Sequence, residues 1–367
     1  MLTASLSRLV RRSFAPSPLA PSPLAPSPLA TALCALTLVA SCATNTPTSN
    51  PTPTVNYTSE YATAVASVER RQLQDDAAAA AGARSVLLTH GHPTPRAFVL
   101  LHGFSDSPSQ FRAVGEHLFA GGDNVYIPRL PHHADRVRRV RELGRVRAKE
   151  LALFGDSTID IARSLGDTVI VVGLSAGGAI GAHLVQTRRE VYRAVLLAPA
   201  IGAGGVSDDD ERNLLVLASV LPDIRRSEPA DSTRPDYIQG ITTRGLAQVL
   251  QLGHEVRDQA GSSAARGSNM VFVLNERDHT VNEDAALDLA RRWAIHGASV
   301  SAFRFPGSAN LPHNIMEIPQ RGGNPDVVLP VVEALALART PPETVHSVDI
   351  PCDGFDCVRQ WWRKRGR

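Results

Sequence analysis

The stretch VIVVGLSAGGAIGAHL (residues 169–184) sets one serine, Ser175, between a run of β-branched residues and a glycine-rich segment. The run Val169–Val172 is apolar without alternation, which is typical of a strand buried on both faces and therefore of a parallel sheet covered by helices. The segment after Ser175 is helix-like. A serine at such a junction is either a nucleophile or an ordinary turn or helix-capping residue, and its surroundings have to decide between these.

Strand-like and helix-like segments alternate along the chain. The helix-like segment EYATAVASVERRQLQ (60–74) comes first, and two apolar runs after it, SVLLTHG and AFVLLHG, are expected to form neighbouring strands. Further strand-like runs follow, most of them separated by helix-like segments: NVYIPRL, TVIVVGLS, AVLLAPA, MVFVLNE and VSAFRFP. This order predicts an α/β fold of three layers, with a mostly parallel central sheet, over residues 60–345.

One span breaks the alternation. Residues 201–269 contain no strand-like run, but they include two helix-like segments, DDDERNLLVLASVLPDI and TRGLAQVLQLGHEV. The sequence therefore predicts a helical insertion in the α/β domain, at about residues 203–267.

Composition bounds the class of protein. With 43% hydrophobic and 20% charged residues among 367, the chain can form a large buried core. Its formal charge is +2, and this becomes −1 without residues 1–41, which hold three arginines and no acidic residue. A general attraction to nucleic acid is therefore not expected.

The N-terminus has the features of an export signal. Arginines come first, and the apolar run TALCALTLVA (31–40) is too short for a stable membrane-spanning helix. The run leads into VASC, which resembles the lipobox of bacterial lipoproteins, so we predict cleavage of residues 1–41 and lipidation of Cys42 in the bacterial cell envelope. The polar residues 42–59 would then be a flexible tether. A plain secretory signal or an uncleaved anchor is the alternative, and RRSF (11–14) leaves the general and the twin-arginine export routes both open.

Two cysteines stand near the C-terminus, in the tail that we assign to residues 346–367. Cys352 and Cys357 flank DGFD, whose Asp-Gly pair can form a tight turn, and an oxidising compartment favours a disulfide between them. Two free thiols are the alternative. The tail ends in WWRKRGR, a composition suited either to a membrane interface or to packing on the domain.

If Ser175 is a nucleophile, its neighbours have defined tasks. Gly173 and Gly177 leave room around a side chain that a tight strand-to-helix turn exposes. The amide of Ala176, at the helix start, would stabilise a developing oxyanion. A base and an acid are also required, and they are expected in loops at the carboxyl ends of later strands.

Two downstream residues meet these requirements. Asp278 follows the strand-like run MVFVLNE and His313 follows VSAFRFP, so both lie where a catalytic acid and base are expected. Asp278 is preferred to the nearby acids Glu276 and Asp284. His313 is preferred to His296, which lies within a helix-like segment. His279, beside Asp278, is expected on a surface loop.

Four motifs, taken in order, resemble the α/β-hydrolase superfamily, and most of all its monoacylglycerol lipase and carboxylesterase branch. They are LHGF (101–104), GLSAG (173–177), ERDHTV (276–281) and NLPHN (310–314), and the resemblance spans residues 85–337. It implies an acyl-ester hydrolase whose helical insertion is a cap over the pocket. It also implies that the amide of Phe104 is the second oxyanion donor and that His102 has a structural role.

Two segments depart from the family pattern. PRLPHHADR (128–136) stands where many members carry a Pro-Gly-His-Gly turn, and Asn314 stands where an acidic residue is common. A metal site at His132, His133 and Asp135 is not favoured, since no second cluster has ligand spacing, and no cofactor is predicted.

These features predict a serine hydrolase that cleaves carboxylic esters, with monoacylglycerols or short-chain lipids as substrates, through Ser175, His313 and Asp278. Its expected partners are a small ester or lipid and, through Cys42, a membrane. Acyl transfer or peptide hydrolysis by the same residues is one alternative. A non-catalytic lipoprotein that only binds at the envelope is another.

Overall fold

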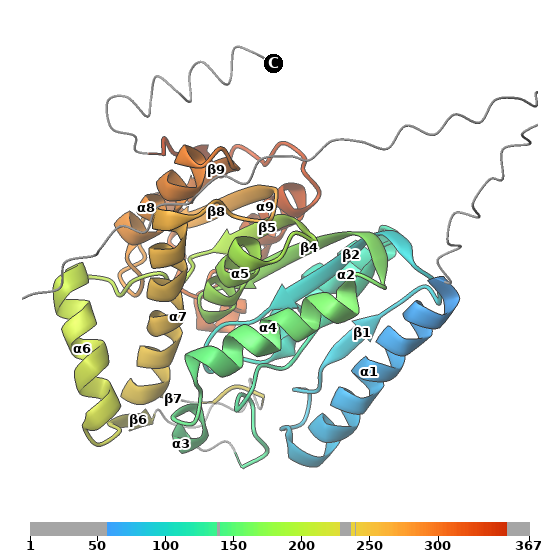
Figure 1. Cartoon of the computed structure of the whole chain (residues 1–367), viewed down its shortest axis with the longest axis horizontal. Coiled ribbons are helices and arrows are strands. Elements are labelled where there is room, and N and C mark those ends of the chain that lie inside the picture. The colour runs from blue at the N-terminus through green and yellow to red at the C-terminus, as the bar shows by residue number, and fades with distance from the viewer. Residues whose placement is uncertain (1–56, 138–139, 228–235, 239, 351–367) are drawn as a thin grey trace, which may run out of the picture. The chain divides into compact units, whose positions relative to one another are not determined.

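The computed structural model describes residues 57–137, 140–227, 236–238 and 240–350, and a mixed sheet lies at its centre. The strands of this sheet are β1 (Val86–Leu88), β2 (Thr94–Leu101), β3 (Asn124–Ile127), β4 (Gly166–Leu174), β5 (Val191–Leu197), β8 (Asn269–Asn275), β9 (Ser299–Phe305) and β10 (His346–Ser347). Their order is β1-β3-β2-β4-β5-β8-β9-β10 (Figure 1). The strands from β3 to β9 in this order pair in parallel, and the edge strands β1 and β10 are antiparallel to their neighbours. The predicted fold class is confirmed.

Helices cover both faces of the sheet. One face carries α4 (Ala148–Ala162), α5 (Ala176–Thr187), α7 (Thr243–Ser262) and α8 (Glu283–Ile295), and the other carries α2 (Arg112–Ala120) and α9 (Pro325–Ala336). In β4, Val171 belongs to the first core and Val172 to the second, so successive side chains meet opposite helix layers. This is why the apolar run in the sequence does not alternate.

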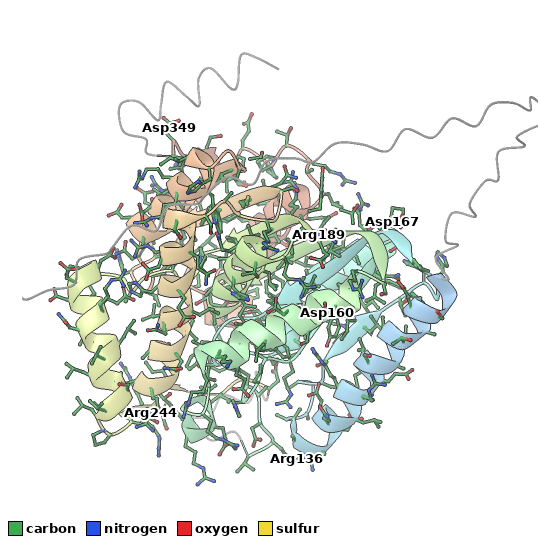
Figure 2. The ribbon with its side chains drawn as sticks, viewed as in Figure 1. Arg136, Asp160, Asp167, Arg189, Arg244 and Asp349 are labelled. Atoms are coloured by element: carbon green, nitrogen blue, oxygen red, sulfur yellow. The ribbon has the colours of Figure 1, made fainter. Side chains whose placement is uncertain are left out.

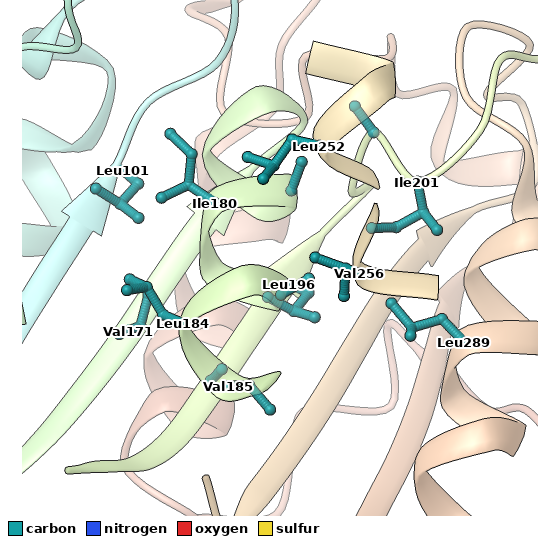
Figure 3. Packing of buried hydrophobic residues seen from close by; sticks show 14 of the residues in the cluster. Leu101, Val171, Ile180, Leu184, Val185, Leu196, Ile201, Leu252, Val256 and Leu289 are labelled. Carbon is teal, nitrogen blue, oxygen red and sulfur yellow. The ribbon is translucent and has the colours of Figure 1, made fainter. Parts of the chain in front are cut away.

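The larger core lies between α5, α7 and α8 and the strands beneath them (Figure 3). Leu184 of α5, Val256 of α7 and Leu289 of α8 belong to this core, together with Leu196 of β5. All four side chains are fully buried. α5 is therefore held firmly, and its first turn, which directly follows Ser175, has a fixed position on the sheet.

The two strands expected to be neighbours are separated. β3 lies between β1 and β2, and its first residue, Asn124, holds the connection that crosses it. The side-chain oxygen of Asn124 accepts from the amide of His90 at 2.9 Å, and its side-chain nitrogen donates to the carbonyl of His92 at 2.8 Å. These bonds turn the chain across the end of β3, so the prediction of adjacent pairing was wrong.

The span between β5 and β8 contains more than one kind of structure. It holds α6 (Asp208–Val220) and a short hairpin of β6 (Arg225–Ser227) and β7 (Gly240–Thr242), followed by α7. α7 packs on α5 and buries its apolar side chains in the larger core. α7, which the sequence analysis includes in the helical insertion at about 203–267, is therefore part of the layer that covers the sheet, and the same span also holds the short strands β6 and β7.

The ends of the described domain also differ slightly from the prediction. α1 (Tyr57–Ala78) begins within the predicted tether, and β10, together with a bond from the amide of Val348 to the carbonyl of Ala302, joins the start of the predicted tail to the sheet. The predicted signal, Cys42 and the pair Cys352 and Cys357 lie outside the described residues. Across 57–137, 140–227, 236–238 and 240–350, no helix is long and apolar enough to cross a bilayer.

Candidate active site

Ser175 lies at the junction of β4 and α5 in a conformation that non-glycine residues rarely adopt. Its φ is 53° and its ψ is −109°. Three backbone hydrogen bonds hold it there: its amide donates to Leu197, and its carbonyl accepts from Ala179 and Ala200, at 2.9 to 3.0 Å. Backbone strain of this kind persists only where surrounding contacts enforce it, and it is concentrated at functional sites, which makes Ser175 a candidate catalytic residue.

The two glycines beside Ser175 are places where the backbone passes very close to other backbone. A Cβ on Gly177 would clash with the carbonyl oxygen of Leu101, and a Cβ on Gly173 would clash with the carbonyl of Gly177. A side chain at Gly177 would push the serine turn off the end of β2, and a side chain at Gly173 would push the first turn of α5 away from β4. The turn therefore requires glycine at both positions.

His313 connects Ser175 to Asp278. Its Nε2 lies 2.9 Å from Ser175 Oγ, and its Nδ1 lies 2.7 Å from Asp278 Oδ2. The other carboxylate oxygen, Asp278 Oδ1, accepts from the amide of Thr280 at 2.8 Å. The Asp278 side chain is 5% exposed and that of His313 is 22% exposed, so the acid is enclosed while the imidazole still reaches solvent. The structure thus brings these three residues into one hydrogen-bonded row.

The rival residues lie away from this row. Asp284 is exposed in the first turn of α8, and His296 is exposed at the C-terminal end of the same helix. Glu276 is exposed and accepts from the amide of Gly307, and His279 is an exposed loop residue.

Asn275, which the sequence analysis did not single out, holds the loops of Asp278 and His313 in position. It is the last residue of β8 and is buried. Its side-chain nitrogen donates to the carbonyls of Leu311 and Pro312, at 3.1 and 3.0 Å, and its own carbonyl accepts from the amide of Asp278. One residue therefore fixes the loop of His313, through its side chain, relative to the loop of Asp278, which its backbone carbonyl holds. A polar residue at the end of the apolar strand NMVFVLN is the signal that could have identified it.

The loop after β2 carries the two residues assigned to it by resemblance, His102 and Phe104. His102 is fully buried; its Nδ1 lies 2.9 Å from the carbonyl of Gly103, and its Nε2 accepts from the amide of Leu130 at 3.1 Å. Burial, reinforced by the neighbouring His133, lowers the pKa of His102 well below its usual value. A ring that accepts a backbone N–H at Nε2 carries its proton on Nδ1, so His102 is neutral and holds the loop together.

Asn314 joins the loop of His313 to the loop of Phe104. Its side-chain nitrogen donates to Asp106 at 3.3 Å and to Glu317 at 3.0 Å, and its side-chain oxygen accepts from Gln110 at 2.9 Å. Gln110 in turn accepts from the amide of Gly103 at 2.8 Å. A carboxylate at position 314 would face two other carboxylates, which explains in physical terms why an amide stands here.

The residues considered for a metal are used in other ways. His132 Nε2 lies 3.0 Å from a carboxylate oxygen of Glu150, and the buried His133 contacts the carbonyl of Pro131 through Nδ1 at 2.8 Å. Asp135 accepts from the amide of Val137. Within the described parts of the chain, no group of three or more histidine, cysteine and acidic residues is arranged to hold a metal ion.

The buried His133 makes the stability of the protein depend on pH. Burial lowers the pKa of His133 to about 4, whereas a histidine in an unfolded chain titrates near about 6.5. Between these values the unfolded state binds more protons, so the full stability is present above pH 6.5 and falls as the pH falls toward 4. We expect His133 to contribute a loss of roughly 3 kcal/mol in the free energy of unfolding over this range, measured by urea unfolding.

A variant comparison isolates the share of His133. His133→Phe should show a shallower pH dependence than the wild type, although His102 still contributes in the same direction. Equal slopes for His133→Phe and the wild type would contradict the assignment.

Comparison with known proteins agrees with the geometry. The model of the alpha/beta hydrolase family matches residues 98–321. A thermostable monoacylglycerol lipase of Bacillus sp. (strain H-257) is 24% identical over 202 residues, covering 51% of this chain and 72% of that protein. A monoacylglycerol lipase of Paleococcus ferrophilus superposes with a TM-score of 0.52 at 19% identity, covering 69% of this chain and 98% of the other.

Two further solved structures share the fold. A soluble variant of monoglyceride lipase from Saccharomyces cerevisiae, in complex with a substrate analogue, has a TM-score of 0.53 at 13% identity, over 70% of this chain and 90% of that one. A structure reported for two metagenome-derived lipolytic enzymes has a TM-score of 0.56 at 15% identity, over 71% of this chain and all of that one. Because the family model matches more than half of the sequence, and the matched residues include the turn that holds Ser175, the chain belongs to the alpha/beta hydrolase family.

Proposed function

We propose that this protein hydrolyses carboxylic esters, with monoacylglycerols or short-chain lipid esters as substrates. The observation that carries the proposal is the row from Ser175 Oγ through His313 to Asp278, with distances of 2.9 and 2.7 Å, built on a strained turn at the start of a helix. A hydroxyl, an imidazole and a buried carboxylate in this order are the parts that acyl transfer from an ester requires.

In the first step, Ser175 Oγ bonds to the carbonyl carbon of the ester while His313 Nε2 takes the hydroxyl proton. The carbonyl oxygen becomes an oxyanion, which accepts hydrogen bonds from the amides of Phe104 and Ala176. Asp278 accepts the Nδ1–H bond and stabilises the charged imidazolium. The bond to the alcohol then breaks, and Nε2 returns the proton to the leaving oxygen, so Ser175 is left acylated.

In the second step, water releases the acyl group. His313 Nε2 takes a proton from the water as its oxygen bonds to the acyl carbon, and the same amides receive the oxyanion again. The bond to Ser175 Oγ breaks, Nε2 returns the proton to Oγ, and a carboxylic acid leaves. The imidazole acts as base and then as acid in each half of the cycle.

The surface of α6 supports a lipid ester as the substrate. This helix lies against α7, but most of its side chains are exposed, and Glu211 is its buried residue. Large apolar side chains on α6 and directly after it are 46 to 73% exposed: Leu214, Val216, Leu217, Val220, Leu221 and Ile224. An apolar patch of this kind is costly in water and marks a surface that meets apolar material. The relatives named as monoacylglycerol and monoglyceride lipases point to the same substrate class.

The proposal is tested on the purified protein with a fluorophosphonate probe and an ester panel. We expect one labelled residue, Ser175, identified by mass spectrometry, and release of fatty acid from monoacylglycerols and from p-nitrophenyl esters of graded chain length. Transfer of the acyl group to added glycerol, in place of fatty acid release, would assign a transferase. A folded protein that neither takes up the probe nor cleaves any ester would disprove the proposal.

A further inference from the structure

The loop after β3 packs against the side chain of Phe104. His133 in this loop is fully buried, and its ring meets the ring of Phe104 edge-on, with centroids 5.3 Å apart. It also meets His102 edge-on at 5.4 Å. The position of His133 therefore limits where the side chain of Phe104 can lie, and with it the backbone of the loop that carries the Phe104 amide.

The backbone of this loop is strained on both sides of His133. His132 and Ala134, on either side of His133, have φ values of 64° and 49°. Such left-handed conformations are strained at residues other than glycine, so they persist only where surrounding contacts enforce them. The loop therefore needs support from outside itself.

Arg129 and Asp75 supply that support. Arg129 donates from Nη1 to the carbonyl of His133 and from Nε to Asp75 Oδ1, both at 2.7 Å. The second oxygen of Asp75 accepts from the amide of Ser85 at 2.8 Å. The side chains of Asp75 and Arg129 are only 7 and 13% exposed. An enclosed ion pair contributes little net stability, so its value lies in the geometry it fixes.

Asp75 belongs to α1, and the backbone around the end of α1 holds the same loop. The amide of Ala80 donates to the carbonyl of Ala134, and the amide of Arg136 donates to the carbonyl of Ala78, both at 2.8 Å. Figure 2 labels Arg136 close to the lower end of α1. Both α1 and Ser85 precede residue 98, where the match to the family model begins.

We propose that Asp75 and Arg129 are positioning residues for ester hydrolysis, which hold His133 against Phe104 and so fix the Phe104 amide where the oxyanion forms. The inference rests on the proposed function, because it takes Phe104 as an oxyanion donor. It gives α1 a part in turnover and not only in stability. A displacement of a donor by a fraction of an ångström weakens the bond to the oxyanion more than it weakens ground-state binding.

Asp75→Asn tests this, since it removes the charge that orients Arg129 and keeps the shape of the side chain. We expect kcat for p-nitrophenyl butyrate to fall about tenfold or more, with KM changed by less than about twofold. The affinity for a trifluoromethyl ketone, which binds as a tetrahedral oxyanion, should fall by the same factor as kcat/KM. If Asp75→Asn does not fold, Arg129→Lys, which keeps the charge but shortens the reach to His133, gives the same test.

Asp123→Asn is the matched control. Asp123 is 3% exposed and accepts two hydrogen bonds of 2.9 Å from Arg96, but it lies at the amino end of β3, away from the serine. We expect it to lower the midpoint of thermal unfolding while leaving kcat and the inhibitor affinity unchanged. Unchanged kcat in Asp75→Asn, or an equal loss in both variants, would overturn the inference.

The NMR chemical shift of the Phe104 backbone amide tests this inference separately from the proposed function. This chemical shift should change in Asp75→Asn and stay the same in Asp123→Asn, whether or not the protein cleaves esters. A wild type without esterase activity disproves the proposed function alone. A Phe104 signal that does not respond to Asp75→Asn disproves the positioning role.

Discussion

Replacing Ser175 by alanine is expected to lower kcat/KM for p-nitrophenyl butyrate by at least ~10⁴-fold, because the lost oxygen is the atom that bonds to the acyl group. The Ser175 side chain makes no helix-capping hydrogen bond, and its hydroxyl lies 2.9 Å from His313 Nε2. The midpoint of thermal unfolding should therefore stay close to that of the wild type. Steady-state kinetics and labelling by the fluorophosphonate probe are the measurements, and the label should be absent from the variant.

Ser207→Ala is the control for this change. Ser207 precedes α6, and its hydroxyl caps that helix by accepting from the amide of Asp210 at 3.2 Å. Its loss should cost about 1 kcal/mol in stability and leave turnover unchanged, which is the reverse of the pattern for Ser175. Turnover that survives intact in purified Ser175→Ala would end the proposal that Ser175 is the nucleophile.

The candidate site could be predicted from the sequence because a parallel sheet gathers its loops at one edge. Ser175, Asp278 and His313 are far apart in the chain, yet each lies in the turn or loop that follows a strand, and the carboxyl ends of parallel strands meet. The positions of the strands, together with the order of serine, acid and histidine typical of the family that the motifs resemble, were enough to expect these residues near one another. The structure places them within hydrogen-bonding distance, which the sequence alone could not show.

The order of the strands in the sheet was harder to predict from the sequence. β1 is three residues long and only partly buried, so nothing in its pattern distinguishes β2 from β3 as a partner. Pairing is decided by bonds between distant residues, such as those that Asn124 makes to the segment before β2. Local spacing carries no information about such contacts.

The place where α7 packs could not be predicted for a similar reason. Val249, Leu252 and Val256 of α7 have the spacing of an amphipathic helix, which shows that one face is buried but not what covers it. The helix could equally have lain on a cap or on the sheet, and it lies on the sheet. The role of Asn314 was also inaccessible from the sequence, because its contact with Gln110 joins residues that are 204 positions apart.

Asp278→Asn is expected to lower kcat/KM about 10⁴-fold, through the proton position on His313. Asp278 Oδ1 accepts from the amides of Thr280 and Val281, so an asparagine must keep its carbonyl oxygen on that side. Its NH₂ group then faces His313 Nδ1, which has to accept and can no longer carry the proton. The proton moves to Nε2 and points at Ser175 Oγ, so the imidazole cannot take the hydroxyl proton.

Asp284→Asn, the same substitution at the exposed rival in α8, should leave kcat/KM unchanged and serves as the control. Because the change at Asp278 preserves shape and hydrogen-bonding to the loop, stability should fall far less than activity, and KM should stay near the wild-type value. A retained activity above about a tenth of the wild type would mean that the imidazole keeps its working tautomer without the carboxylate. That result would remove Asp278 from the mechanism while leaving Ser175 and His313 in place.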